Sequence, residues 1–130
     1  MTQEEEKNLL LKDLCSRLPY GVRYRHFTWN DEYGETYIAA QIYSINTDGY
    51  VKNCHDDETV YIDNVRPYLF PLSSMTEEQK KEYQYITERW MYDPVYSISD
   101  SIDWLNKHHF DYRGLIEKGL AIDATGLNIY

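Results

Sequence analysis

The sequence lacks any long hydrophobic run. A membrane-spanning helix needs roughly 18 or more apolar residues in succession, and the run Leu9–Leu11 is far shorter than that. The first residues include Glu4–Glu6, which is the opposite of the basic start that a signal peptide shows. We therefore expect a cytoplasmic protein that makes no membrane contact.

Cysteine is scarce, because Cys15 and Cys54 are the only two in the chain. A disulfide between them is conceivable, but a reducing compartment argues against it. Cys15 falls on the apolar face of an expected helix, where a free thiol behaves as a small hydrophobic side chain. The loop Cys54–Glu58 (CHDDE) contains four residue types that bind metals, yet zinc sites take their ligands from separated segments. We expect a solvated turn there, with no metal.

Positive charge is also in short supply. Thirteen basic side chains face 22 acidic ones, which gives a formal net charge of −9. This charge opposes attraction to a phosphate backbone, so we expect no direct binding of nucleic acid. Arg23, Arg25 and the adjacent His26 are the candidate for a local basic patch, and the alternative is a set of solvated charges on one strand face.

Motifs of catalysis and of cofactor binding are missing as well. The chain has no Gly-x-Ser-x-Gly elbow and no Gly-x-Gly-x-x-Gly phosphate loop. His108 and His109, with Asp111 nearby, could suggest acid–base chemistry or a metal, but adjacent helical side chains point about 100° apart. We therefore expect a protein that is not an enzyme, with no catalytic residue, no cofactor-binding residue and no cofactor.

The residues that are present predict a single α+β domain over 1–130. Thr2-x-x-Glu5 can cap a helix over 3–18 that carries a leucine stripe. From Gly21 the hydrophobic period changes to two, which predicts strands at 22–29, 36–45, 50–53 and 59–63. Tight turns between them favour a small, curved antiparallel sheet, of which an SH3-like barrel is one form. Helix and sheet together occupy 1–64.

Two prolines mark a hinge over 65–75, before a helical part at 76–130. Pro67 and Pro71 remove backbone donors, so we expect an extended segment there with no helix or central strand, and with Leu69 or Phe70 buried beneath the next helix. Two capping boxes, Ser74-x-x-Glu77 and Thr76-x-x-Gln79, can then start a helix over 76–91. Its expected inner face is made by three residues, Tyr83, Ile86 and Trp90.

The C-terminal part should pack against the sheet. Ser97 or Ser99 can cap a second helix that carries a stripe of Ile98, Ile102 and Leu105 and ends near residue 108. Residues 113–119 are expected to make one or two helical turns closed by Gly119, and residues 120–122 a small edge strand. We expect Asp111 and Arg113 to fix this turn through local hydrogen bonds or a charge pair.

Fourteen tyrosines are the unusual feature of the composition. Tyrosine combines a large apolar ring with a hydroxyl group, which suits half-buried and interfacial positions. Some must lie in the core of a domain of this size. The excess favours a contact surface.

Three blocks of the sequence resemble an uncharacterised family of small proteins carried by phages, prophages and mobile elements of gut Bacteroidales. The blocks are Leu9–Val22 (LLLKDLCSRLPYGV), Arg66–Thr76 (RPYLFPLSSMT) and Trp104–Ile116 (WLNKHHFDYRGLI). The resemblance implies a phage or mobile-element setting in the cytoplasm of a bacterial host, and it implies no catalytic residue.

The function that we expect is a non-enzymatic protein-binding module whose partner is a protein, with a homo-oligomer left open. The alternative is an acidic mimic of DNA that inhibits a host nucleic-acid enzyme, which the net charge and the phage setting motivate.

Overall fold

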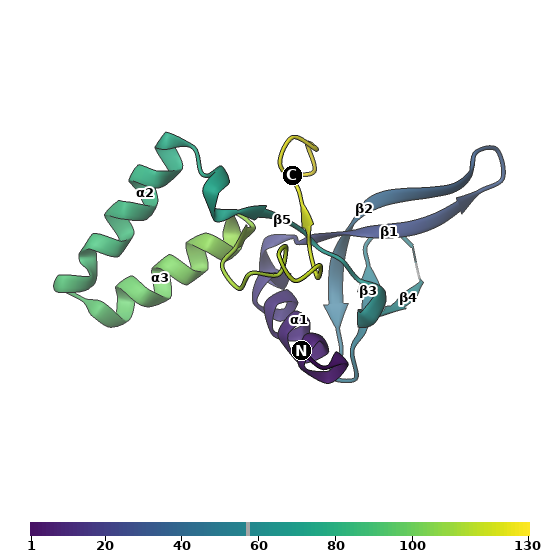
Figure 1. The fold of residues 1–130 in the computed structure, drawn as a ribbon, viewed down its shortest axis with the longest axis horizontal. Coiled ribbons are helices and arrows are strands. Elements are labelled where there is room, and N and C mark those ends of the chain that lie inside the picture. Colours follow the sequence, from purple (N-terminus) through teal and green to yellow (C-terminus); the bar gives the residue numbers. More distant parts are fainter. Residues whose placement is uncertain (57) are drawn as a thin grey trace.

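A computed structural model describes residues 1–56 and 58–130 and shows an elongated α+β molecule (Figure 1). Helix α1 (Gln3–Arg17) lies in the middle. The strands β1 (Arg23–Asn30), β2 (Gly34–Ile45), β3 (Tyr50–Asn53) and β4 (Thr59–Tyr61) lie on one side of it, and helices α2 (Glu77–Glu88) and α3 (Pro94–Lys107) on the other. Strand β5 (Tyr68–Pro71) runs between the two sides, flanked by the two-residue strands β6 (Phe110–Asp111) and β7 (Ile122–Asp123). The α+β prediction is confirmed.

Helix α1 forms as its sequence predicts. The Thr2 hydroxyl accepts a hydrogen bond from the Glu5 amide at 3.1 Å, which caps the first turn. Leu10 and Leu14 are buried against the sheet, in the larger of two hydrophobic cores. The expectation for Cys15 was wrong, because this thiol is exposed. Both cysteines are free.

The four N-terminal strands form a curled antiparallel sheet in the order β1-β2-β3-β4. Strands β1 and β2 pair from Arg23 opposite Gln41 to Asn30 opposite Gly34, which makes a long hairpin. Inward positions alternate as predicted, so that Tyr24, Ala40, Ile42 and Val51 are buried. The last strand is shorter than expected, since residues 62–64 form a 3₁₀ turn whose first residue, Ile62, is buried in the core.

The hinge does contain a central strand, and the expectation that prolines exclude one was wrong. Strand β5 is the middle of a three-stranded parallel sheet in the order β6-β5-β7. Its prolines stand just before and at the end of the strand. The Phe70 amide still donates to the His109 carbonyl at 2.8 Å, and the Pro67 carbonyl accepts from the Ile122 amide at 2.8 Å. The short ladder therefore keeps hydrogen bonds to both neighbouring strands, although Pro67 and Pro71 have no amide hydrogen to donate.

Helices α2 and α3 form a hairpin. The capping box at Thr76 is present: its hydroxyl accepts from the Gln79 amide at 3.1 Å, and the Gln79 side chain accepts from the Thr76 amide at 2.9 Å. Helix α3 begins earlier than expected, at Pro94, because proline suits the first turn of a helix. Ser97 is therefore no cap, and its hydroxyl donates to the Ile86 carbonyl of α2 at 2.8 Å.

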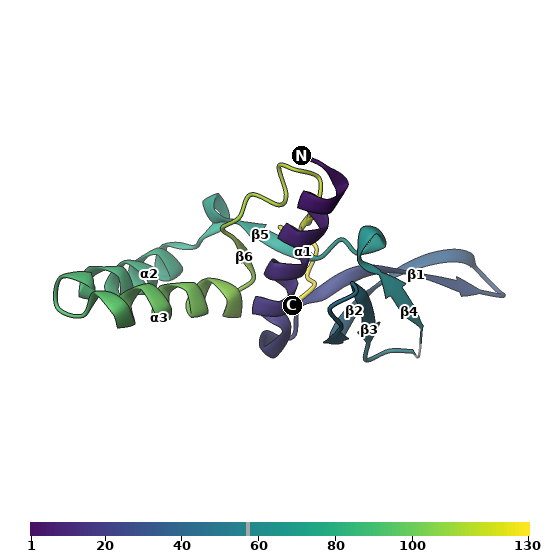
Figure 2. The same cartoon turned by 90° about the horizontal axis from the view of Figure 1, so that it is seen from below.

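This helical hairpin projects away from the four-stranded sheet, as both views show (Figures 1 and 2). The expectation that the helical part packs against that sheet was wrong for α2 and α3, whereas Leu115, Leu120 and Ala121 farther along share the large core with the sheet. A second, smaller core holds the base of the hairpin, where buried Trp104, Leu105 and Phe110 meet Phe70 and Tyr83. None of the helices in the described part of the chain is long and apolar enough to cross a membrane.

A buried ion pair joins the two sides. The Arg17 guanidinium donates to the Asp13 carboxylate from Nε at 2.8 Å, and from Nη2 to the Phe110 carbonyl at 2.6 Å. Arg113 approaches the same Asp13 carboxylate at 3.2 Å. The three sequence blocks Leu9–Val22, Arg66–Thr76 and Trp104–Ile116 meet here, since Arg17 belongs to the first block, Phe110 to the third, and Phe70 of the second pairs with Phe110.

The turn after β6 is fixed partly as expected. The Asp111 carboxylate accepts hydrogen bonds from the Leu115 and Ile116 amides, both at 2.9 Å, which confirms its local role. Arg113 is different, because it reaches Asp13 of α1 instead of a partner in the turn. Residues 115–119 form a chain of turns with no helix, closed by Gly119 at φ +73°. The strand that follows covers Ile122–Asp123, slightly later than expected.

Candidate functional site

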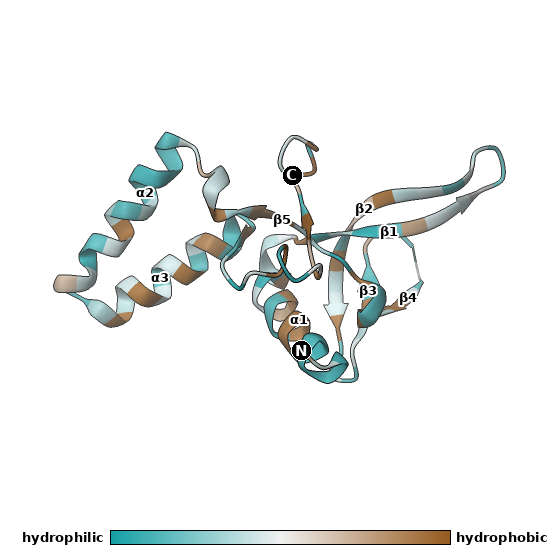
Figure 3. Cartoon of the chain, in the orientation of Figure 1, coloured by the Kyte–Doolittle hydropathy of each residue, from teal (hydrophilic) through white to brown (hydrophobic). Residues whose placement is uncertain are grey.

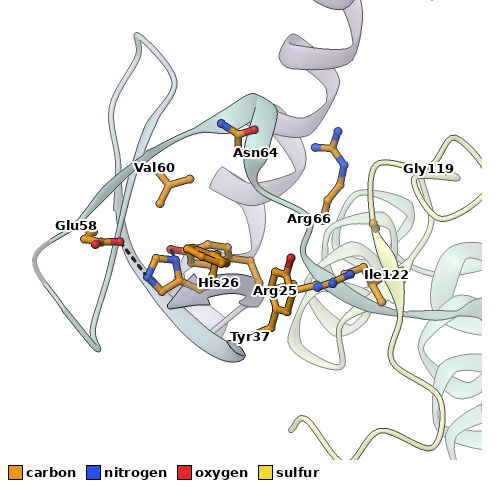
Figure 4. A pocket seen from close by; sticks show the side chains of 12 residues that line it. Arg25, His26, Tyr37, Glu58, Val60, Asn64, Arg66, Gly119 and Ile122 are labelled. Carbon is orange, nitrogen blue, oxygen red and sulfur yellow. Dashed lines mark hydrogen bonds and ion pairs between the residues drawn. The ribbon is translucent and has the colours of Figure 1, made fainter. Parts of the chain in front are cut away.

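A cleft of about 510 Å³ opens where the edge strand β1 meets β5 and the C-terminal segment (Figure 4). Its volume lies within the roughly 300–1,000 Å³ of small-molecule sites. The Arg25 amide donates to the Arg66 carbonyl at 3.1 Å, which ties β1 to the start of the β5 segment at the floor of this cleft. The lining includes His26, Tyr37, Glu58, Arg66 and Ile122.

A polar network is built around His26, which is only 3% exposed. Its Nε2 lies 3.0 Å from Asp56 Oδ2 and 3.6 Å from Glu58 Oε2. Its Nδ1 lies 3.1 Å from the Tyr24 hydroxyl, which in turn accepts from the Asn53 amide at 3.0 Å. With a proton on Nε2, the ring donates to Asp56 and its Nδ1 accepts from the Tyr24 hydroxyl, whereas Glu58 at 3.6 Å is beyond hydrogen-bond distance. The network holds β1, β3 and the loop after β3 together.

The titration of the neighbouring groups follows from this arrangement. Burial raises the pKa of the Tyr24 hydroxyl, so it stays protonated. Burial alone would raise the pKa of Asp56, but hydrogen bonds from His26, from the Glu58 amide and from Asn53 outweigh it and hold that pKa below its usual value. Asp56 is therefore a carboxylate at neutral pH.

The structure divides the loop Cys54–Glu58. Asp56 and Glu58 converge on His26, whereas Cys54 and His55 line a separate shallow depression beside Arg23 and Gln41. Asp57 lies outside the described residues. We expected no metal because the loop Cys54–Glu58 had no matching ligand from a separated segment of the chain. The structure brings His26 of β1 to this loop, and His26 is a possible ligand from a separated segment. The sequence signal of His26 was its even position along β1, which places it on the inward face with Tyr24.

The candidate basic patch on β1 does not include His26, which faces inward, away from Arg23 and Arg25. Arg25 and His26 point in opposite directions along the strand (Figure 4). Arg25 lies over the Tyr37 ring, 3.9 Å from its centroid, and the Arg23 guanidinium donates to the Ala39 carbonyl at 3.2 Å. His26 is buried in the network described above.

The two adjacent histidines do not share a ligand either. His108 packs against Trp104, with 4.5 Å between ring centroids, and His109 stacks on Tyr130 at 3.7 Å. Asp111 is occupied by two backbone amides. These contacts give all three residues structural roles.

An unpartnered apolar surface lies on the helical hairpin. Val95, Ile98 and Ile102 repeat at the spacing of one helix face and are 76%, 53% and 41% exposed. Of the stripe expected on this helix, Leu105 is buried, whereas Ile98 and Ile102 face solvent. Figure 3 shows the apolar bands along α3. We call the exposed apolar residues of this arm the hairpin surface: Tyr85, Trp90, Met91, Tyr92, Val95, Tyr96, Ile98 and Ile102.

Aromatic side chains gather at the connection between the two helices. Trp90 and Met91 belong to a 3₁₀ turn after α2, and Tyr92 follows it at 92% exposure. Tyr96 is exposed one turn into α3. The inner face of α2 was predicted more accurately for Tyr83 and Ile86, which contact the small core, than for Trp90, which is exposed.

We compared the chain with protein-family models, with curated proteins and with solved structures, and none of the three comparisons found a match.

Proposed function

We propose that the protein is a non-enzymatic protein-binding module that contacts its partner through the hairpin surface. The observation that supports this most is the apolar stripe of α3, which no other element of the described chain covers. The setting that we propose is a phage or mobile element, on the basis of the three sequence blocks alone.

The size of the hairpin surface supports an interface. Its four exposed aromatic side chains alone present on the order of 500 Å², taking about 150–250 Å² for a whole aromatic side chain. The largest apolar patch of a typical monomer measures roughly 300–600 Å². Met91 and the aliphatic stripe add further exposed apolar area, and because Tyr96 lies about 160° around α3 from Ile98, the hairpin surface covers more than one face of the arm.

The charge around the hairpin surface favours a different protein over a second copy. Residues 77–107 contain seven acidic side chains and four basic ones, and the whole chain carries −9. Two copies would therefore repel each other as they approach. The partner that fits is a protein with an apolar groove and a basic rim.

The alternative of a DNA mimic has less support from this arm. Its carboxylates are interleaved with basic side chains: Lys80 lies 3.2 Å from Glu77, and Arg89 lies 3.4 Å from Asp100. A mimic of DNA needs ordered rows of unpaired carboxylates. The net charge remains its support.

A matched pair of substitutions tests the proposal. Ile98→Lys places a charge in the apolar stripe, and Thr47→Lys places the same charge on an exposed position of the turn between β2 and β3, away from the hairpin surface. Tagged wild type captures the partner from host lysate, and the affinity of the purified partner is then measured for both variants. We expect Ile98→Lys to weaken binding at least tenfold, Thr47→Lys to leave it within about twofold, and added salt to weaken it for the wild type.

Sedimentation of the purified protein alone tells whether a second copy of the chain or a different protein covers the hairpin surface. A wild-type monomer agrees with a different protein as partner. A wild-type dimer that Ile98→Lys converts to a monomer would show that a second copy covers the hairpin surface. Equal binding by both lysine variants would show that the partner binds elsewhere.

A further inference from the structure

His26, Asp56 and Glu58 bring three metal-binding atoms together from two segments of the chain. Nε2 of His26 lies 3.0 Å and 3.6 Å from the two carboxylate oxygens, and all three atoms lie within 4.8 Å of one another. Bonds of about 2.0–2.1 Å at a tetrahedral angle place neighbouring ligands about 3.4 Å apart. The two separations from Nε2 are therefore already close to the edge length of a tetrahedral site.

Neighbouring residues hold His26 and Asp56 in place by hydrogen bonds, as residues next to the ligands of bound metals do. The Tyr24 hydroxyl contacts Nδ1 of His26, so it fixes the plane of the ring. Asp56 Oδ1 accepts from the Asn53 side chain at 3.2 Å and from the Glu58 amide at 3.0 Å, which leaves Oδ2 directed at His26. The orientation of two ligands is thus set before any ion arrives.

Charge and access also suit a cation. The two carboxylates bring a charge of −2, which matches a divalent ion, and mixed nitrogen and oxygen ligands suit zinc-like ions better than calcium or magnesium. Glu58 is 70% exposed and lines the cleft together with His26, so an ion can reach the site from solvent (Figure 4).

We propose that His26, Asp56 and Glu58 form a site for one divalent cation of the zinc class. On binding, Nε2 of His26 coordinates the ion and its proton moves to Nδ1. The Tyr24 hydroxyl accepts this new donor once its own proton, which pointed at Nδ1, turns away from the ring. The site is independent of the hairpin surface.

Calorimetry with zinc chloride on EDTA-treated protein tests the site. We expect one zinc ion per chain in the wild type. Glu58→Gln removes an exposed ligand without disturbing the buried network, and we expect it to weaken zinc binding at least tenfold. His55→Asn and Glu117→Gln are matched controls that remove a neighbouring histidine and an unrelated exposed carboxylate, and both should stay within twofold of the wild type.

A spectroscopic measurement identifies the ligand atom. Nitrogen-15 NMR of the imidazole should show the His26 proton on Nε2 without zinc and on Nδ1 with zinc. The proposal fails if the wild type shows no saturable binding, if Glu58→Gln binds as the wild type does, or if His55→Asn abolishes binding. The last result would assign the metal to Cys54 and His55 instead.

Discussion

His109 shows how a single side chain in this protein is controlled by its surroundings. It adopts a left-handed backbone conformation with φ +62°, and its ring is buried against the Tyr130 ring. Burial, reinforced by the nearby Arg17 guanidinium, lowers the pKa of His109 from 6.5 to about 4. The ring is therefore neutral in the folded protein at physiological pH.

This shift predicts how stability depends on pH. Between pH 6.5 and about 4 the unfolded chain binds a proton that folded His109 does not, so the free energy of unfolding falls as the pH is lowered through this window. The full shift corresponds to roughly 3 kcal/mol. We expect the free energy of unfolding, measured by urea denaturation, to fall less between pH 7 and pH 5 in His109→Asn than in the wild type, because the variant lacks this titrating ring. Asparagine is the replacement because it tolerates positive φ.

His55→Asn is the control for this experiment, because it removes a histidine from a loop instead of from a core. It should keep the wild-type dependence on pH. If His109→Asn loses as much stability as the wild type between the two pH values, other groups must cause the loss.

Strand β5 shows how neighbouring residues of one element serve two cores. Leu69 is fully buried in the large core with α1 and the curled sheet, whereas Phe70 points toward Phe110 and the base of the helical hairpin. The alternation of a strand sends adjacent side chains to opposite sides. One short strand therefore connects both cores.

Substitutions along this strand should reflect that division. We expect Leu69→Ala to lower the free energy of unfolding by about 3–5 kcal/mol, because it leaves a cavity in a closed core. Phe70→Ala should cost about 2 kcal/mol, since Phe70 is only partly buried. Leu72→Ala is the control: its side chain is exposed, so its effect should stay within about 0.5 kcal/mol. Equal losses for Leu69 and Leu72 would contradict the placement of β5.

Local periodicity predicted most of these elements and failed where long-range placement decides. The stripe of leucines predicted α1, and the period of two predicted β1 to β4, because both patterns depend on a neighbouring core. The stripe of Ile98 and Ile102 has the same form, yet it faces solvent. A stripe indicates that an apolar face exists, and it does not say which element, or which other protein, covers that face.

The candidate site was hidden for a related reason. Asp56 and Glu58 were visible in the sequence as a polar loop, but His26 stands 30 residues away from Asp56. Only the curl of the sheet brings β1 to that loop. The alternation along β1 placed His26 on the inward face together with Tyr24, and this was the one local signal of its role.

The whole molecule is two structured sides held at one junction. The curled sheet and α1 share the large core, the helical hairpin ends in the small core, and Arg17 bonds to Phe110 across the boundary. Of the three tryptophans, Trp29 and Trp90 are exposed and Trp104 is buried in the small core. Tryptophan fluorescence therefore reports mainly on the small core, while far-ultraviolet circular dichroism reports on both sides.

We predict that Arg17 couples the two sides. Arg17→Met leaves the buried Asp13 carboxylate with Arg113 as its remaining ionic partner, so we expect a loss of about 3 kcal/mol, at the lower end of the roughly 3–5 kcal/mol for a broken buried pair. Thermal unfolding followed by fluorescence and by circular dichroism should coincide in the wild type. In Arg17→Met the fluorescence transition should come at a lower temperature.

The double variant Asp13→Leu with Arg17→Met is the matched control, because it replaces the buried pair by apolar side chains of similar size and leaves the partly exposed Arg113 as the remaining charge. Such replacements often cost little, since the desolvation of both charges is avoided. We expect the double variant to recover at least about 1 kcal/mol relative to Arg17→Met, on the same principle. If the double variant is no more stable than the single one, the unpaired Asp13 charge is not the source of the loss. If the two signals still coincide in Arg17→Met, the shared strand β5 couples the two sides without Arg17.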